Sequence, residues 1–391
     1  MPVSDGNEVR PFTIDVADDV LADLRQRLAD TRWPDEIPNT QWDYGTNLAY
    51  LEELVEYWRT GFDWRAQETK LNNFSHFKSQ VDGLDIHFIH ERGKGPDPMP
   101  LIITHGWPSC FFEMTKIIPL LTDPASHGGD AADSFDVVAP SLPGFGFSDA
   151  ARDRGMEVQR VAGMWNKLMT QNLGYPRFAA QGGDIGSGVT ARLGFAHSDT
   201  LYGIHQTSIT RPTPYLGEGS KPITEAEQAH IDQRAKWFQD EGGYNHIQGT
   251  KPQTLAYGLN DSPVGLAAWI VEKYRMWSDC GGDVEKRFTK DELLTIVTIY
   301  WVTQTISSST RMYYENQHNL WVMEKDQKVP APAGMALFPQ EIAVPPREWG
   351  ERSYDIRQWN YMPRGGHFAA LEEPQLLAEE VREFFRPLRE G

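Results

Sequence analysis

The sequence is poor in cysteine and in basic residues, and each shortage narrows the class of protein. Only two cysteines occur among 391 residues, Cys110 and Cys280, and neither stands in a Cys-x-x-Cys or Cys/His spacing. A disulfide framework and a zinc site are therefore not supported. The 37 Lys and Arg residues stand against 55 Asp and Glu residues, which gives a formal net charge of −18. A chain this acidic is not expected to bind nucleic acid or an anionic membrane.

Long apolar runs and targeting signals are also lacking. The N-terminus has no signal-peptide pattern, and no run reaches the length of a membrane span. The closest, residues 293–306, contains four Thr and a Gln and is interpreted as a buried helix. The Gly-rich turn at 143–148 lacks the helix-opening Gly spacing of a dinucleotide site. The sequence thus predicts a soluble, cytoplasmic protein with no membrane partner, no organic cofactor and no metal.

What the sequence does contain is a Gly-rich turn at residues 181–187, between an apolar run and a small-residue helical segment. Strand, sharp turn and helix form the context of a nucleophile elbow, whose central residue has small neighbours. Here the centre is Asp184, flanked by Gly182, Gly183 and Gly186. A carboxylate at this place can attack carbon and form an ester with the enzyme. The alternative is an ordinary strand-to-helix turn in which Asp184 is the helix N-cap.

An ester-forming Asp needs a base that activates water, and the base needs an orienting acid. His367 lies in a Gly-rich loop before the last helix, and Glu341 follows the preceding strand. The resulting chain order of nucleophile, acid and histidine is that of α/β hydrolases. Simpler interpretations are a surface histidine and a solvated loop carboxylate. The competing acids, further from a strand end, are Glu348, Glu351 and Asp355.

Hydrolysis of an ester also needs two backbone N–H donors for the oxyanion. A turn at residues 105–109 comes after the apolar run 101–104, and Gly106 allows it to be tight. The N–H of Trp107 can then face Asp184 and form an oxyanion hole with the N–H of Ile185. The alternative is an ordinary turn at a strand end.

The order of periodic patterns predicts an α/β fold with a mostly parallel sheet. Residues 1–80 read as a helical and irregular segment with too little apolar surface for its own core, so this segment is expected to wrap around the rest of the chain. Strands alternate with helices over 81–207, which predicts parallel pairing. Helices dominate 208–330, with capping boxes at 224–227 and 289–292, and this part is interpreted as a lid. Residues 331–391 return to the α/β pattern.

The chain resembles the microsomal-type epoxide hydrolases over nearly its whole length. The resemblance is carried by the elbow with Asp184, His-Gly-Trp-Pro at 105–108, Arg-Gly-Gly-His-Phe at 364–368, and the lid stretches 243–252, 259–268 and 311–316. It implies an α/β-hydrolase fold with an N-terminal meander and a helical lid. Mammalian members begin with a membrane-anchoring helix, which this chain does not show, so a membrane location is not implied.

The resemblance also implies a role for each matching residue. Asp184 would be the nucleophile, His367 the base and Glu341 the orienting acid. Tyr244 and Tyr313 would be lid tyrosines that hold the epoxide oxygen, with Tyr314 as the alternative to Tyr313. A neutral phenol can donate a hydrogen bond to the oxygen and deliver a proton as the strained ring opens.

The sequence therefore predicts an enzyme that converts a hydrophobic epoxide and water to a vicinal diol through an Asp ester. A haloalkane or haloacid dehalogenase is the first alternative, because it uses the same Asp, His and acid; the ring N–H of Trp107 could then bind halide. A non-catalytic binding protein of the same fold is the second. A serine esterase is disfavoured because Asp holds the elbow. A homodimer is compatible with the sequence.

Overall fold

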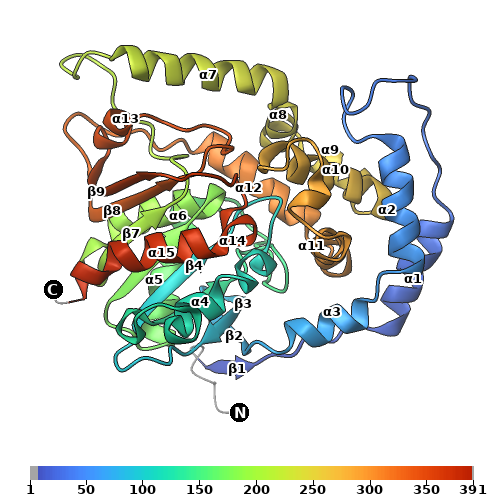
Figure 1. Ribbon diagram of the computed structural model, residues 1–391, viewed down its shortest axis with the longest axis horizontal. Helices are drawn as coiled ribbons and strands as arrows, with labels where there is room; N and C mark the ends of the chain where they lie inside the picture. The colour runs from blue at the N-terminus through green and yellow to red at the C-terminus, as the bar shows by residue number, and fades with distance from the viewer. Residues whose placement is uncertain (1–7, 390–391) are drawn as a thin grey trace.

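The computed structural model describes residues 8–389, which surround one nine-stranded sheet (Figure 1). The strand order is β1-β2-β3-β5-β4-β6-β7-β8-β9. The six strands β4 to β9 pair in parallel with their neighbours. Strands β1, β2 and β3 extend the sheet beyond β5 through antiparallel pairs. The predicted mostly parallel sheet is confirmed. The bounds are β1 (Val9–Pro11), β2 (His76–Val81), β3 (Leu84–Glu91), β4 (Met99–Thr104), β5 (Phe135–Pro140), β6 (Phe178–Gly182), β7 (Leu201–Gln206), β8 (Val329–Leu337) and β9 (Tyr354–Tyr361).

The central strands β4 to β7 are buried along nearly their whole length, because both faces of the sheet are covered. Neighbouring residues of one strand enter different cores: Ile102 packs on one side, and Leu101 and Ile103 pack on the other. Helices α5 (Val158–Lys167) and α6 (Asp184–Ala196) contribute to the first core. Helices α4 (Ile118–Thr122) and α15 (Pro374–Phe385) contribute to the second. This burial fixes the carboxyl ends of the parallel strands, where the predicted site residues lie.

The N-terminal segment forms α1 (Asp18–Ala29), α2 (Leu48–Thr60) and α3 (Trp64–Leu71) along one side of the molecule (Figure 1). Helices α1 and α2 pack against α10, and α2 and α3 pack against α11. The expectation that residues 1–80 contain only helical and irregular structure is wrong, since β1 and most of β2 belong to the sheet. A three-residue edge strand with a proline and no alternation carries no readable period.

Six helices lie between β7 and β8 and cover the carboxyl side of the sheet (Figure 1). They are α7 (Glu225–Glu241), α8 (Gly243–Thr250), α9 (Pro252–Leu259), α10 (Pro263–Trp277), α11 (Lys290–Thr303) and α12 (Ile306–His318). Both predicted capping boxes are present, at the starts of α7 and α11. The nine residues from Leu293 to Trp301 are buried, as predicted for this apolar run. The division of the chain at residues 80, 207 and 330 stays a prediction.

The remaining helical elements are short connections around the sheet. They are η1 (Phe111–Thr115), η2 (Pro124–His127), η3 (Ala131–Asp133), η4 (Leu168–Asn172), η5 (Ser198–Thr200), η6 (Val284–Lys286), α13 (Arg347–Glu351), α14 (Ala369–Glu372) and η7 (Arg386–Leu388). Between residues 8 and 389, no helix is long and apolar enough to cross a membrane. That same range holds no group of three His, Cys, Asp or Glu suited to a metal ion.

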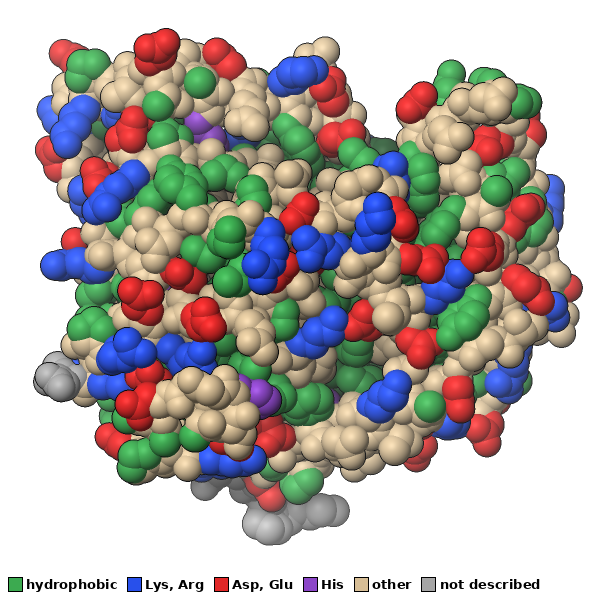
Figure 2. All heavy atoms as spheres, viewed as in Figure 1, with side chains coloured by type: hydrophobic (Ala, Val, Ile, Leu, Met, Phe, Trp, Pro, Cys, Tyr) green, Lys and Arg blue, Asp and Glu red, His purple; other side chains and the backbone are tan. Residues whose placement is uncertain are grey.

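A groove of about 1550 Å³ separates the lid from the N-terminal segment. It lies between residues 27–51 on one side and residues 240–276 on the other. Figure 2 shows it as a deep notch at the upper right of the surface. Tyr244 lies in its wall and also lines the cavity that contains Asp184.

Substitution of Gly186 by Ala should destabilise the fold, because α6 rests directly on the end of β4. An added Cβ would stand 2.0 Å from the backbone oxygen of Thr104. Overpacking of this kind costs about 3 kcal/mol of unfolding free energy. Gly163→Ala in α5 is the matched control, since its Cβ would meet nothing within 4 Å; it should stabilise by about 0.4 to 1 kcal/mol. Urea unfolding midpoints check both, and equal midpoints would contradict the packing argument.

Candidate functional site

The elbow places Asp184 at the first position of α6, directly after β6. Its backbone has a φ of 49°, in the left-handed region that non-glycine residues rarely adopt. Gly183 occupies the N-cap position, so the interpretation of Asp184 as N-cap is wrong. The backbone N–H of Asp184 donates to Oγ of Ser208 at 3.2 Å, and its carbonyl accepts from Thr210. These contacts hold a strained residue at the carboxyl edge of the sheet.

The turn after β4 lies directly against the Asp184 side chain. A Cβ on Gly106 would stand 2.3 Å from Oδ1 of Asp184, so no other residue leaves room for the carboxylate. The N–H of Trp107 donates to that same Oδ1 at 2.8 Å. Burial raises the pKa of Asp184, and a backbone hydrogen bond from Ile185 is one of the contacts that counteract this rise. The two N–H groups predicted for the oxyanion hole therefore both act on the Asp184 carboxylate.

His367 and Glu341 meet beside Asp184. The two loops that carry them are joined by a backbone bond from Gln340 N–H to the Gly365 oxygen at 3.1 Å. Nδ1 of His367 lies 2.6 Å from Oε1 of Glu341, and Nε2 lies 3.7 Å from Oδ2 of Asp184. The side chains of both His367 and Glu341 are less than 5 % exposed. The structure thus brings together the predicted nucleophile, base and acid.

The three competing acids lie elsewhere. Glu348 accepts from the Thr224 hydroxyl at the start of α7. Glu351 forms an ion pair with Arg347, and Asp355 forms one with Arg357. None of the three lines the cavity that contains Asp184. Glu341 is therefore the acid that contacts His367.

The lid supplies two tyrosines from different helices. Tyr244 lies on α8 and Tyr313 on α12, with ring centroids 5.9 Å apart. The Trp107 ring stacks on Tyr244 at 5.4 Å and meets the edge of Tyr313 at 5.7 Å. Both tyrosines line the cavity of Asp184, whereas Tyr314 stacks on His318 and does not. The geometry selects Tyr313 over its neighbour.

Burial and charge set the protonation of these groups. Burial opposes the charge of His367, but the charge and hydrogen bond of Glu341, together with the charge of Asp184, raise its pKa to about 9. Burial raises the pKa of Asp184, while the His367 charge and the N–H of Trp107 counteract it. Burial, helped by the charge of Asp184, also raises the pKa of Tyr244 and Tyr313. Both phenols therefore keep their protons at neutral pH and can donate.

A cavity of about 280 Å³ contains Asp184, Glu341 and His367. Its apolar lining is formed by Val158, Trp237, Phe238, Leu320 and Ile342. The volume lies near the lower limit of about 300 Å³ for small-molecule sites. An apolar cavity with a few convergent polar groups suits a small hydrophobic ligand.

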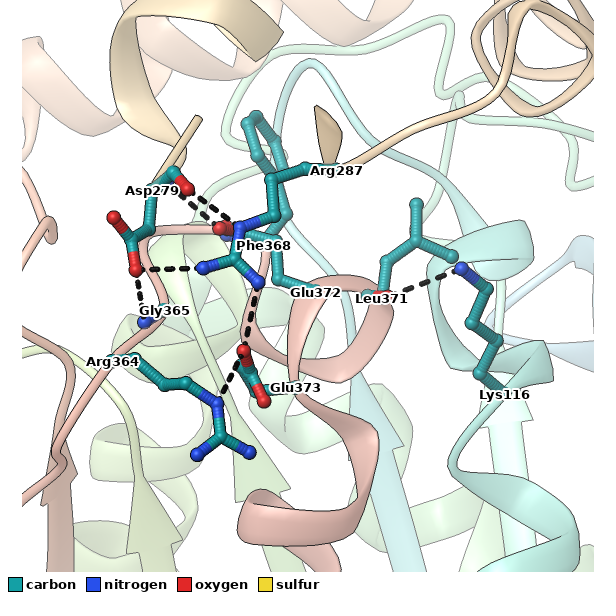
Figure 3. A network of polar contacts seen from close by, with 9 residues as sticks. All are labelled: Lys116, Asp279, Arg287, Arg364, Gly365, Phe368, Leu371, Glu372 and Glu373. Carbon is teal, nitrogen blue, oxygen red and sulfur yellow. Dashed lines mark hydrogen bonds and ion pairs between the residues drawn. The ribbon is translucent and has the colours of Figure 1, made fainter. Parts of the chain in front are cut away.

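A polar network ties the lid to the loop of His367 (Figure 3). The carboxylate of Glu372 accepts from the N–H of Phe368 at 3.0 Å and from the N–H of Asp279 at 2.9 Å. Asp279 in turn accepts from the N–H of Gly365, and Arg287 bonds Asp279 and Glu373. The network fixes the histidine loop against the end of α10.

Sequence reasoning missed several residues around the histidine. The Trp277 ring lies 5.1 Å from His367 and 5.0 Å from Tyr244, and the Trp277 oxygen accepts from the His367 N–H. Glu113 is buried nearby, and burial raises its pKa to about 7. Neither residue belongs to a recognisable pattern, since α10 and η1 only approach His367 in the folded chain. The Gly-Gly pair before His367 was the available signal for the loop itself.

Comparison with known proteins finds relatives that match nearly the whole chain. The family described as "Epoxide hydrolase N terminus" matches residues 9–114, and that of the alpha/beta hydrolase fold matches residues 99–200. Epoxide hydrolase 1 of Sus scrofa is 40% identical, over 97% of this chain and 89% of its own length. Epoxide hydrolase 1 of Oryctolagus cuniculus is 41% identical, over 96% and 88%. The solved structure of Aspergillus niger epoxide hydrolase has a TM-score of 0.86 at 29% identity, covering 99% of this chain and 98% of its own.

The raised pKa of His367 can be measured directly. We expect its imidazole to titrate near pH 9 in the wild type, because Glu341 and Asp184 stabilise the charged form. Protonation then stabilises the fold fully below about pH 6.5, and this contribution disappears as the pH rises through about 9. Glu341→Gln should lower the pKa by about 1 to 3 pH units. NMR of the histidine rings, assigned by the signal lost in His367→Gln, provides the test; an unchanged value would contradict the pairing.

Proposed function

Because the chain belongs to the epoxide hydrolase family, its activity is the hydrolysis of epoxides, and we propose that it proceeds through a covalent ester on Asp184. One observation carries the proposal. Asp184 stands at a strained elbow, where one carboxylate oxygen accepts the Trp107 N–H and the other faces His367. Oδ1 is thus held by a hydrogen bond, while Oδ2 remains free to attack an epoxide carbon.

In the first step, Oδ2 of Asp184 attacks an epoxide carbon and the bond from that carbon to the ring oxygen breaks. The oxygen gains negative charge and takes a proton from Tyr244 or Tyr313. Both phenols remain protonated until then, because burial raises their pKa. Oδ1 stays bonded to the Trp107 N–H and becomes the carbonyl oxygen of the ester.

In the second step, Nε2 of His367 takes a proton from water, and the resulting hydroxide attacks the ester carbonyl. The oxyanion forms on Oδ1, where the N–H groups of Trp107 and Ile185 stabilise it. The intermediate collapses with loss of the diol oxygen, which regains its proton through His367. The carboxylic acid left at Asp184 releases its proton to solvent and becomes a carboxylate, and the tyrosinate takes a proton from solvent.

Formation of the ester itself prepares His367 to act as a base. With Asp184 ionised, the pKa of His367 is about 9 and the ring is charged at neutral pH. Conversion of the carboxylate to a neutral ester removes one of the charges that raise this pKa, while burial continues to oppose protonation. His367 can then lose its proton to solvent, and the neutral ring can act as the base that activates water.

The apolar cavity wall favours a hydrophobic epoxide as substrate, with water as the second reactant. The cytoplasmic location and the homodimer remain predictions of the sequence.

Intact-protein mass spectrometry of His367→Gln mixed with styrene oxide tests the ester. We expect a mass gain equal to the whole epoxide, mapped to Asp184, because the variant lacks the base that hydrolyses the ester. Asp184→Asn should gain no mass, and the wild type should release diol. No adduct on His367→Gln, while the wild type makes diol, would rule out the ester mechanism.

A chloroalkane forms the second arm of the same experiment. The indole N–H groups of Trp107 and Trp277 are buried and lack a hydrogen-bond partner within residues 8–389, and such donors can bind halide. An alkyl adduct with chloride release, and none from the epoxide, would favour a dehalogenase instead. The expected result is the reverse.

The choice between the adjacent tyrosines can be checked by rapid-mixing kinetics of ester formation. Tyr313→Phe removes a proton donor from the cavity and should slow the step roughly 10- to 100-fold, since Tyr244 remains. Tyr314→Phe is the matched control and should leave the rate within about twofold, because its ring packs on His318. Equal losses in both variants would contradict the assignment.

A further inference from the structure

The cavity of Asp184 has a second, cationic end that the proposed mechanism does not use. We call it the basic end and define it as Arg211, His230, Arg234 and Asn316, all of which line the cavity. Arg211 lies on the loop after β7, and Arg234 lies on α7, the helix that crosses the top of the molecule (Figure 1). The basic end is thus assembled from the sheet edge and the lid.

Neither arginine of the basic end has an acidic partner. Arg211 donates to the backbone oxygen of Asn316 at 3.2 Å, and Arg234 lies over the Phe238 ring at 5.5 Å. Within residues 8–389, neither forms an ion pair. Arg352, which follows α13, is by contrast paired with Glu227 near the start of α7. Both guanidinium groups therefore line the cavity without a carboxylate partner from the described residues.

The surroundings leave this charge largely uncompensated. Arg211 is half-buried, and burial lowers its pKa, whereas Arg234 remains exposed to solvent. Glu157 partly counteracts this at Arg211, but its carboxylate already accepts two backbone N–H groups at the start of α5. His230 is 7% exposed, and its Nδ1 has no hydrogen-bond partner in the described part of the chain. Charged groups in such a site are stabilised when a ligand of opposite charge binds.

The two ends of the cavity differ in sign. Asp184 and Glu341 lie at the reacting end and repel an anion, while the basic end attracts one. The cavity lining also includes Trp237, Phe238 and Ile342, which suit a hydrocarbon segment. A ligand with an anionic group and an apolar body would therefore bind in one direction only.

We propose that the basic end binds the carboxylate of a hydrophobic epoxide acid, so that the epoxide ring lies at Asp184. The substrate class is then an epoxide whose apolar segment separates the ring from a carboxylate, which a planar guanidinium can bind through two hydrogen bonds. This inference rests on the proposed function and adds its substrate preference.

Rates of diol formation from matched probes test the preference. The first probes are styrene oxide, 4-carboxystyrene oxide and the neutral 4-carboxamide. A second pair, 9,10-epoxyoctadecanoate and its methyl ester, places a longer apolar segment between the epoxide and the carboxylate. We expect kcat/KM of the wild type to be on the order of tenfold higher for a carboxylate than for its neutral match in at least one pair. The ratio within each pair removes differences in epoxide reactivity.

Arg234→Gln should bring that ratio close to one and leave the neutral probes within about twofold, because Arg234 forms no hydrogen bond or ion pair among the described residues. Lys236→Gln is the matched control: it removes the same charge from the same helix at a residue that does not line the cavity. Its ratio should equal that of the wild type. Arg234→Glu should invert the preference towards a styrene oxide that carries a trimethylammonium group.

The outcomes separate the two proposals. If the enzyme forms diols from the neutral probes and shows no preference for carboxylates, the proposal that the basic end binds a carboxylate is wrong. The proposed function then remains intact. A preference that survives both Arg234 variants, or that Lys236→Gln abolishes equally, would also overturn it. Absence of diol from every probe would overturn the proposed function, and this inference with it.

Discussion

The hydrogen bond from the Trp107 N–H to Oδ1 of Asp184 is the contact on which the site depends. It requires the turn after β4 to approach the elbow so closely that only glycine fits at position 106. It also requires Asp184 to hold a left-handed backbone at the first position of α6. Parallel pairing of β4 with β6 provides both conditions, because it brings the two carboxyl ends side by side. Packing of the buried sheet therefore orients the Asp184 carboxylate.

The lid contributes more than a cover. Its helices supply the phenols of Tyr244 and Tyr313, and its α10 end reaches the loop of His367 through Trp277 and the Glu372 network. The two tyrosines and His367 are consequently held by contacts to the same group of lid helices. In the proposed mechanism, a displacement of α10 would therefore alter both the opening of the ring and the activation of water.

The charges that line the cavity, rather than the net charge of the chain, set the electrostatic potential at the site. The net charge of −18 argues against polyanionic partners but says nothing about a pocket in which a few side chains decide the local potential. The His367 ring lies between the carboxylates of Glu341 and Asp184. Arg211 and Arg234 lie in the same cavity without acidic partners, and this separation of sign gives the site a direction.

The sequence by itself determined the elements that local pattern encodes. The apolar runs of β4 to β7, the capping boxes of α7 and α11, and the Gly-flanked Asp184 can be read from neighbouring residues, whose propensities act over a few positions. The short edge strand β1 could not be predicted, because three residues that include a proline show no alternating apolar pattern. Only the tertiary structure decided that Glu341 rather than Glu348 contacts His367, that Tyr313 rather than Tyr314 enters the cavity, and that Arg211 shares that cavity with Arg234. Those choices depend on how helices distant in the chain pack over the sheet, and packing between distant segments leaves no local signature.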